Sequence, residues 1–266
     1  MNKNLLIGAI SGNYSISDIK NWAESSRWVD VDRTLLIYNS QDNPALIEYL
    51  TQEGIDIITP DFDFFGRPLS ATNTDTGNVT LQGTYDLVHN LRFFHISQYL
   101  ESVEYQKVFT TDVKDVYFNS SPFDKTPDDA IIATGEVVKY NEHDWNTRHL
   151  LTNLGLFGHN LLEEEVYNVG VFGGGKEQVK ALCRDIYLLS CGKPLVADQT
   201  SFNYLIRNSY KDKTTLTSLE DKFTVHLHVI KEGVVKFNLE DLKDYTVVHQ
   251  YDRFGNEILN YYTLPK

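Results

Sequence analysis

Residues 105–124, YQKVFTTDVKDVYFNSSPFD, contain the pattern that decides the predicted fold. A short apolar run leads into Asp112 and Asp115, and a second apolar run follows at residues 116–118. The pattern predicts a buried strand that presents two carboxylates at its end. Ligands of open α/β sheets bind at the carboxyl ends of strands, where two carboxylates can hold Mg²⁺ or Mn²⁺. The alternative is that both aspartates are helix-capping or turn residues.

The segment before this stretch alternates between strand-like and helix-like patterns. Continuous apolar runs predict buried strands at residues 5–10, 34–38 and 55–59. The segments between them predict helices at residues 15–28 and 44–54. This β-α-β-α-β order predicts a parallel, doubly wound sheet.

The rest of the chain continues the alternation without a linker or an internal repeat, which predicts one domain. A helix at residues 84–101 is apolar on two sides, so we expect it to be largely buried although it carries Arg92. Two long stretches, residues 60–83 and 141–165, have the character of functional loops. The other expected elements are strands at 129–134, 166–172, 223–229 and 245–249, and helices at 177–190 and from 198 onward.

The composition argues against several classes of partner and location. The 266 residues carry a net charge of −13 and no basic run, which disfavours nucleic acid and anionic membranes as partners. No segment reaches about 18 consecutive apolar residues, and the first residues lack a signal-peptide pattern. Cys183 and Cys191 form neither a disulfide framework nor a zinc signature. We therefore expect a cytoplasmic protein with reduced cysteines and no transmembrane segment.

Four motifs, taken in their order and spacing, resemble a GT-A glycosyltransferase of the family 8 type, or a close viral or bacterial relative. In that family an aspartate motif after the fourth strand is followed by an F-N-[AS]-G-V strand, a D-Q-x-x-x-N helix and a histidine near the C-terminus. The matching motifs here are the aspartate pair, YNVGVFGGG at 167–175, ADQTSFNYLI at 197–206 and VVHQYDR at 247–253.

The resemblance spans residues 4–252 as scattered motifs. It implies a GT-A, Rossmann-like fold: a mixed, mainly parallel sheet flanked by helices in a single domain. It also implies a nucleotide-sugar-binding half at residues 1–125 and an acceptor-side half at residues 126–266. The stretches at 60–83 and 141–165 would then set acceptor specificity.

The resemblance implies a metal site formed by Asp112, Asp115 and His249. The family usually has D-x-D where this chain has D-V-K-D. Counted back from Pro122, Asp115 matches the metal-binding aspartate, and Asp112 is one residue out of register. The alternative for His249 is a structural hydrogen bond. His226 and His228 are expected to alternate along a strand and to share one face, where they are weaker candidates for metal binding.

The family's donor-binding and catalytic residues map onto other positions. Those implied to bind the nucleotide and the donor sugar are Ala9, Ile10, Asn13, Tyr14, Arg92, Asp112, Asn168 and Gly170. Asp198 and Gln199 match the D-Q pair and are the implied catalytic residues, with Asp198 as the base if the enzyme inverts configuration. Structural alternatives are a surface position for Arg92, a strand bulge at Asn168 and Gly170, and a helix cap at Asp198.

The implied activity is metal-dependent transfer of a sugar from a nucleotide-diphosphate sugar to a hydroxyl of a glycan or other acceptor, with Mn²⁺ or Mg²⁺ as cofactor. A UDP-sugar is favoured, although no aspartate lies between Leu5 and Ser17, where the family commonly reads uracil. Two alternatives are a nucleotidyltransferase, which would need a Gly-rich phosphate loop that the first strand lacks, and a non-catalytic carbohydrate- or protein-binding module on the same fold.

Overall fold

The computed structural model describes residues 4–29, 31–38, 40, 43–62, 64, 66, 88–233 and 236–260. Most of the loop expected at residues 60–83, and the first residues of the helix expected from 84, lie outside this part of the chain.

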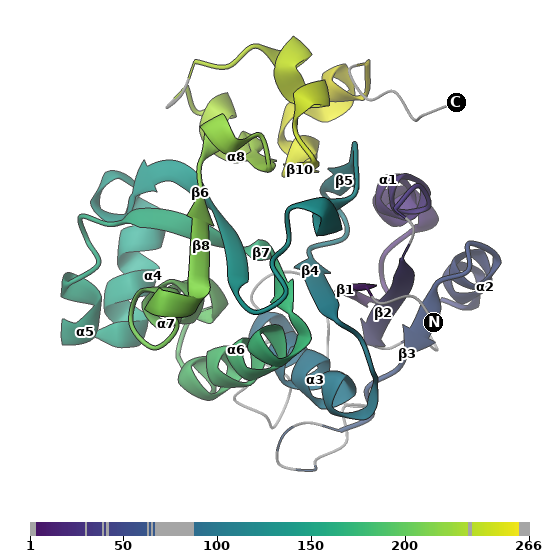
Figure 1. The fold of residues 1–266 in the computed structure, drawn as a ribbon, viewed down its shortest axis with the longest axis horizontal. Helices are drawn as coiled ribbons and strands as arrows, with labels where there is room; N and C mark the ends of the chain where they lie inside the picture. Colours follow the sequence, from purple (N-terminus) through teal and green to yellow (C-terminus); the bar gives the residue numbers. More distant parts are fainter. Residues whose placement is uncertain are drawn as a thin grey trace.

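A mixed seven-stranded sheet forms the centre of the protein, in the order β3-β2-β1-β4-β7-β6-β8 (Figure 1). Neighbouring strands are parallel except at β7, which is antiparallel to both β4 and β6. The predicted fold class, a mainly parallel α/β sheet flanked by helices, is confirmed. The strands are β1 Asn4–Ser11, β2 Asp32–Tyr38, β3 Asp56–Ile58, β4 Lys107–Thr111, β6 Ile131–Lys139, β7 Glu165–Gly175 and β8 Thr214–Thr217.

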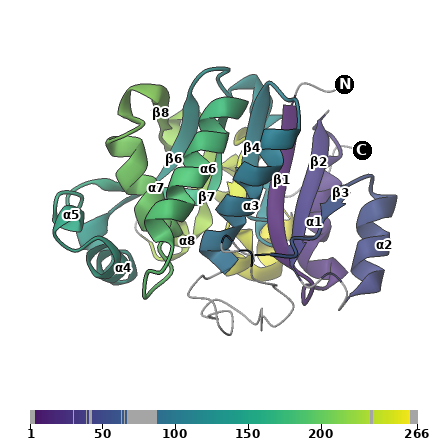
Figure 2. The ribbon, with the colours of Figure 1, turned by 90° about the horizontal axis from the view of Figure 1, so that it is seen from below.

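Helices cover both faces of this sheet, and Figure 2 shows α3 and α6 lying across one of them. The α-helices are α1 Ile16–Ser26, α2 Pro44–Gln52, α3 Val88–Ser102, α4 Asp144–Leu154, α5 Leu156–His159, α6 Lys176–Ser190, α7 Asp198–Arg207 and α8 Leu227–Lys231. The stretch at 141–165, expected to be a loop, is therefore largely helical. Within the described residues, no helix combines the length and apolar character needed to cross a membrane.

The alternation of side chains along β1 explains the two cores. Leu5 and Ile7 pack in a cluster with side chains of α3, α6 and α7, whereas Leu6 and Ile10 pack with α1 and α2. Because both faces of the strand are buried, its sequence is continuously apolar rather than alternating.

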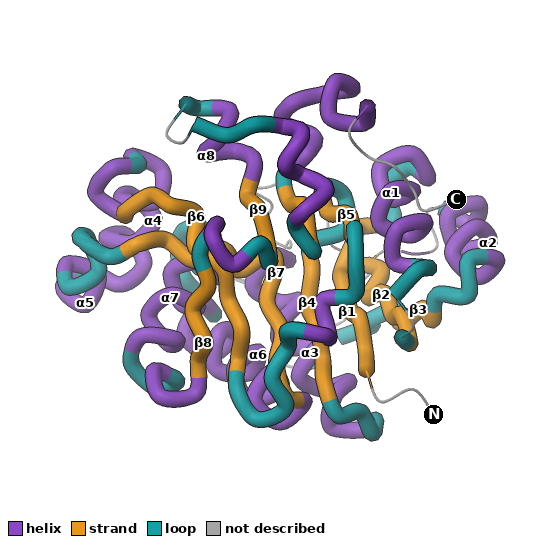
Figure 3. The backbone as a smooth tube through the Cα atoms, turned by 45° about the horizontal axis from the view of Figure 1, so that its top comes forward, coloured by secondary structure: helices purple, strands orange, loops and turns teal. Residues whose placement is uncertain are grey.

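A second, three-stranded sheet lies beside the first and orders its strands β5-β10-β9. These strands are β5 Val116–Phe118, β10 Val247–His249 and β9 Thr224–His226, and Figure 3 shows β9 running into α8. The aspartate stretch, predicted as one strand, is therefore two strands in two sheets. Asp112 and Asp115 lie in the turn between them, and β10 brings His249 against β5.

The strand expected at residues 223–229 is shorter than predicted. It ends at His226, and α8 begins at Leu227, so His226 and His228 do not share a strand face. His226 instead contacts His249, while His228 contacts His143. Side chains two positions apart share a face only along a strand, and the backbone becomes helical directly after His226.

Strand β7 is longer than the predicted strand, because Gly173–Gly175 continue it instead of ending it. Gly173 pairs with Phe109 of β4, and a Cβ atom at this position would overlap with the Phe109 ring. A Cβ atom at Gly174 or Gly175 would overlap with a backbone carbonyl oxygen, that of Ala130 or Asp128 respectively. The glycines are thus required by close packing within the sheet.

Replacing Gly173 with alanine should lower the free energy of unfolding by about 1–3 kcal/mol, the usual cost of overpacking a filled core. Urea denaturation measures this difference. Phe109→Leu in the same chain should recover part of the loss, because the two positions are in contact. Wild-type stability of Gly173→Ala, or strict additivity of the two substitutions, would contradict this account of the strand.

Candidate functional site

Three side chains converge in the turn that follows β4. The His249 Nε2 atom lies 3.5 Å from Asp112 Oδ2 and 3.7 Å from Asp115 Oδ1. One ligand atom from each residue lies within 4.8 Å of the others. The cluster is at the carboxyl edge of the parallel strands, where open α/β sheets bind ligands. The structure therefore brings both aspartates to His249, including Asp112, which was out of register with the family pattern.

A second histidine orients the ring of His249. The two Nδ1 atoms of His226 and His249 are 3.0 Å apart, and both side chains are 1% exposed. When His249 donates its Nδ1–H in this contact, its Nε2 lone pair faces the two carboxylates. The Nε2 atom has no hydrogen bond within the described residues, although it is buried. An outer hydrogen bond that fixes a histidine in this way is typical of metal ligands.

The pKa values of the two carboxylates in the cluster are shifted in opposite directions. Burial disfavours ionisation of Asp112, but Arg92 and His249 outweigh it and hold its pKa well below the usual range. Burial, together with repulsion from Asp112, raises the pKa of Asp115 to about 6 against the opposing effect of His249. Burial lowers the pKa of His249, but the two carboxylates overcome this and raise it.

The donor set fits a divalent cation. Two carboxylates and one imidazole supply oxygen and nitrogen ligands of the kind that bind Mn²⁺ or Mg²⁺. A cation would relieve the repulsion between two carboxylates and would meet the buried Nε2 atom of His249.

Arg92 joins this cluster to the neighbouring helix α7. Its guanidinium pairs with Asp112 through Nη1 and lies 3.2 Å from Asp198 through Nη2. The Arg92 side chain is 14% exposed and Asp198 is 8% exposed, so this is a largely buried ion-pair network. Burial lowers the pKa of Arg92, but Asp112 and Asp198 raise it by a larger amount. The surface position considered for Arg92 is wrong.

Asn168 and Gly170 lie directly behind Asp112. Asn168 donates its amide N–H to Glu136 and accepts the backbone N–H of Gly170 at 2.7 Å. The backbone N–H of Asp112 in turn donates to the Gly170 carbonyl at 2.5 Å. A Cβ atom at Gly170 would overlap with the Asp112 carboxylate, so the missing side chain makes room for that carboxylate.

The proposed catalytic pair lies at the start of α7. The Asp198 carboxylate accepts the Gln199 backbone N–H at 2.8 Å. Ala197 occupies the N-cap position, so Asp198 is the first residue of the helix and not its cap. The Gln199 side chain donates to Asn146 of α4 at 3.1 Å. Asn203, fully buried, bonds to both backbone groups of Tyr167 and fixes α7 to β7.

Of the four N-terminal candidates, Ala9 and Ile10 lie near the end of β1 and Asn13 and Tyr14 follow it, and they differ in what they offer a ligand. Tyr14 lies near enough to the cluster to be influenced by it: burial raises its pKa, and Asp112 and Asp115 add to that effect. Asn13 is exposed and Ala9 is half-buried, but the Ile10 side chain is buried in the core and leaves its backbone for contact.

Glu136 is a site residue that the sequence reasoning missed. It is 2% exposed in β6, and burial raises its pKa to about 7. The sequence feature that could have identified Glu136 is that it is the single carboxylate in the run IIATGEVVK. It was missed because the strand was expected to end at Thr134, which left Glu136 in a loop where a carboxylate is unremarkable.

A cavity of about 600 Å³ lies elsewhere, between α3 and residues 58–66. Its lining includes Phe62, His95 and Tyr99 but none of Asp112, Asp115 and His249. We place the candidate site at the aspartate–histidine cluster, because titratable side chains with shifted pKa values converge there.

No protein-family model matches the chain, and no curated protein matches its sequence. Among solved structures, the apo structure of WbbM, a bifunctional glycosyltransferase, matches with a TM-score of 0.60 and 13% sequence identity. The match covers 94% of this chain but 46% of the other, so this chain spans about half the length of that protein. The likeness shows that the two share a GT-A-like fold.

The variant Arg92→Met should lower the free energy of unfolding by about 3 kcal/mol, the low end for breaking a buried ion pair, because Asp112 is one-third exposed. Although burial opposes ionisation of Asp112, Arg92 holds its pKa below the usual 3.8. The stabilisation is therefore present above that value and lost as the pH falls. Denaturation at several pH values tests this, and a difference that does not shrink in acid would contradict it.

The variant Glu136→Gln tests the buried carboxyl. Burial raises the pKa of Glu136 from 4.5 to about 7, so the folded state resists an ionisation that the unfolded chain undergoes freely. As the pH rises from about 4 to about 8, wild type should lose about 3 kcal/mol of stability relative to the variant. Glu163→Gln, at an exposed position, is the matched control for the removal of one carboxylate. Parallel profiles for wild type and Glu136→Gln would refute the raised pKa.

Proposed function

We propose that this protein is a metal-dependent glycosyltransferase that moves a sugar from a nucleotide-diphosphate sugar to an acceptor hydroxyl. One observation carries the proposal: Asp112, Asp115 and His249 converge at the carboxyl edge of a GT-A-like sheet. The similar structure belongs to a protein described as a glycosyltransferase, which supports the same reaction class here. We favour a UDP-sugar as donor and a glycan as acceptor.

Asp112, Asp115 and His249 would hold Mn²⁺ or Mg²⁺ in this proposal. When bound, such an ion neutralises negative charge on the departing diphosphate. His226 keeps the His249 ring in the orientation in which Nε2 faces the carboxylates. Arg92 keeps Asp112 ionised and fixed in position, so the site is prepared before the donor arrives.

The nucleoside would bind against the segment after β1. The half-buried Tyr14 offers an aromatic face for the base and lies near both carboxylates. Ala9 and the Ile10 backbone line the approach, and the exposed Asn13 offers an amide for the ribose. These contacts do not depend on uracil, so the test below compares UDP with GDP.

The donor sugar would lie between β7 and α7. Asn168 is held by Glu136 and Gly170 and keeps one amide proton for a sugar hydroxyl. The Gln199 side-chain amide donates to Asn146, so the Gln199 side-chain carbonyl oxygen is left to accept from a sugar hydroxyl. The Asp198 carboxylate is already paired with Arg92, so its role here is to position that guanidinium and the start of α7. A carboxylate engaged in this way is poorly placed to act as a free base.

The experiment is calorimetric titration of UDP and GDP into metal-free protein, with and without Mn²⁺. We expect one nucleotide to bind in a metal-dependent manner. The variant Asp115→Asn should weaken that binding more than about 10-fold, because it removes a direct metal ligand. Asp212→Asn, which removes an exposed carboxylate outside the cluster, is the matched control and should bind as wild type does.

Two results would count against the proposal. Failure of both nucleotides to bind folded wild type with Mn²⁺ would favour a non-catalytic carbohydrate- or protein-binding module. Equal binding by Asp115→Asn and wild type would remove the metal assignment. Circular dichroism of each variant separates loss of binding from loss of structure.

A further inference from the structure

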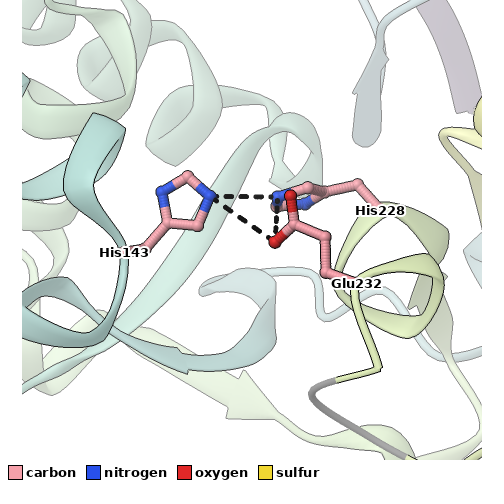
Figure 4. Close-up of side chains that lie close together, drawn as sticks. All are labelled: His143, His228 and Glu232. Atoms are coloured by element: carbon pink, nitrogen blue, oxygen red, sulfur yellow. Dashed lines mark hydrogen bonds and ion pairs between the residues drawn. The ribbon is translucent and has the colours of Figure 1, made fainter.

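A second group of potential metal ligands lies outside the aspartate–histidine cluster. Three side chains point toward one another there: His143, from the start of α4, and His228 and Glu232, from the region of α8 (Figure 4). The two Nε2 atoms are 3.4 Å apart, and each lies 3.8 Å from Glu232 Oε2. None of these three residues takes part in the proposed transfer reaction.

Local structure explains why the three side chains meet. His143 is the N-cap of α4, so its ring is held at the start of that helix. His228 and Glu232 are four positions apart at α8, a spacing that places both on one side of a helix. The His143 and His228 side chains are 20% and 21% exposed, whereas Glu232 is 51% exposed. The cluster is therefore anchored by two shielded imidazoles and remains open to solvent on the carboxylate side.

The distances match those of a metal-binding triad. A point in the plane of the three ligand atoms and equidistant from them lies about 2.1 Å from each, which is the usual zinc–nitrogen and zinc–oxygen distance. A contraction of the triangle by a few tenths of an ångström gives tetrahedral spacing and leaves a fourth position for water.

We propose that His143, His228 and Glu232 form a second metal site, which binds a first-row transition metal of the zinc type. Two imidazoles and one carboxylate suit such ions, whereas the two-carboxylate cluster at Asp112 suits Mn²⁺ or Mg²⁺. The two sites thus differ in ligand chemistry. This second proposal does not rest on the proposed transferase activity.

The site links two parts of the chain that are distant in sequence. His143 and His228 are 85 positions apart, and the cluster joins the N-terminus of α4 to α8. Asn146, in the first turn of α4, contacts Gln199 of the candidate site. A bound metal would fix α8 against α4 and so hold one wall of the acceptor-side half in place. We therefore assign this metal a structural role.

Protonation of His143 must change when a metal binds. Its Nδ1 atom accepts the Asn146 backbone N–H at 3.3 Å, so the neutral ring carries its proton on Nε2. A ring bound to metal through Nε2 carries the proton on Nδ1 instead and gives up this long hydrogen bond. The Nδ1 atom of His228 has no hydrogen bond within the described residues, so its Nε2 can bind metal without breaking one there.

The test uses the full chain with Asp112→Asn and Asp115→Asn, which impair the first cluster. Calorimetric titration of this metal-free double variant with Zn²⁺ should show one bound ion per chain. Adding His143→Ala or Glu232→Gln should weaken zinc binding more than about 10-fold. Adding His159→Ala, an exposed histidine of α5, is the matched control and should leave zinc binding unchanged.

Thermal unfolding gives a second measurement. Zn²⁺ should raise the unfolding midpoint of the double variant and of its His159→Ala derivative, but not of the Glu232→Gln derivative. The Glu232 side chain is half exposed, so its replacement by glutamine should leave the fold intact. Absence of zinc binding in the folded double variant would overturn the proposal. Equal zinc affinity with and without Glu232→Gln would overturn it as well. Nucleotide binding at the first cluster is tested separately, so the two proposals can fail independently.

Discussion

The buried guanidinium of Arg92 is the interaction on which the candidate site depends. It lies between Asp112, in the turn after β4, and Asp198, at the start of α7. Without this positive charge, the buried carboxylate of Asp198 and the partly exposed carboxylate of Asp112 would lose the cation that pairs with both, which is costly for a buried charge. With it, helix α3, the aspartate turn and helix α7 are fixed relative to one another. The neighbouring hydrogen bonds of Asn168, Gly170 and Asn203 then hold β7 within the same frame.

The second constraint is the division of the aspartate stretch between two sheets. Strand β4 belongs to the central sheet, and β5 pairs with β10 in the smaller one. The turn between them is held from both sides, and the pairing of β5 with β10 places His249 beside it. The three candidate ligands are far apart in sequence, but the backbone pairing of the two sheets holds them together without a bound ion. Such preorganisation is what binding and catalysis of a charged group require.

The smaller sheet and α8 also connect the two candidate metal clusters. His226 ends β9 and contacts His249, whereas His228, two residues later, contacts His143. The change from strand to helix at Leu227 directs the two histidines to different partners. One short segment thus contributes to both clusters.

The sequence by itself determined the class of the fold, because strands buried on both faces must be continuously apolar and the helices between them must be amphipathic. The strand-end pattern also identified Asp112 and Asp115, whereas His249, Arg92 and Asp198 came from the family resemblance. The structure links all five through ion-pair contacts. Tertiary structure alone decided that Arg92 is buried, that Gly173–Gly175 lie within a strand, and that Glu136 and His143 have the partners they do. These features depend on contacts between residues distant in the chain, and local periodicity carries no information about such contacts.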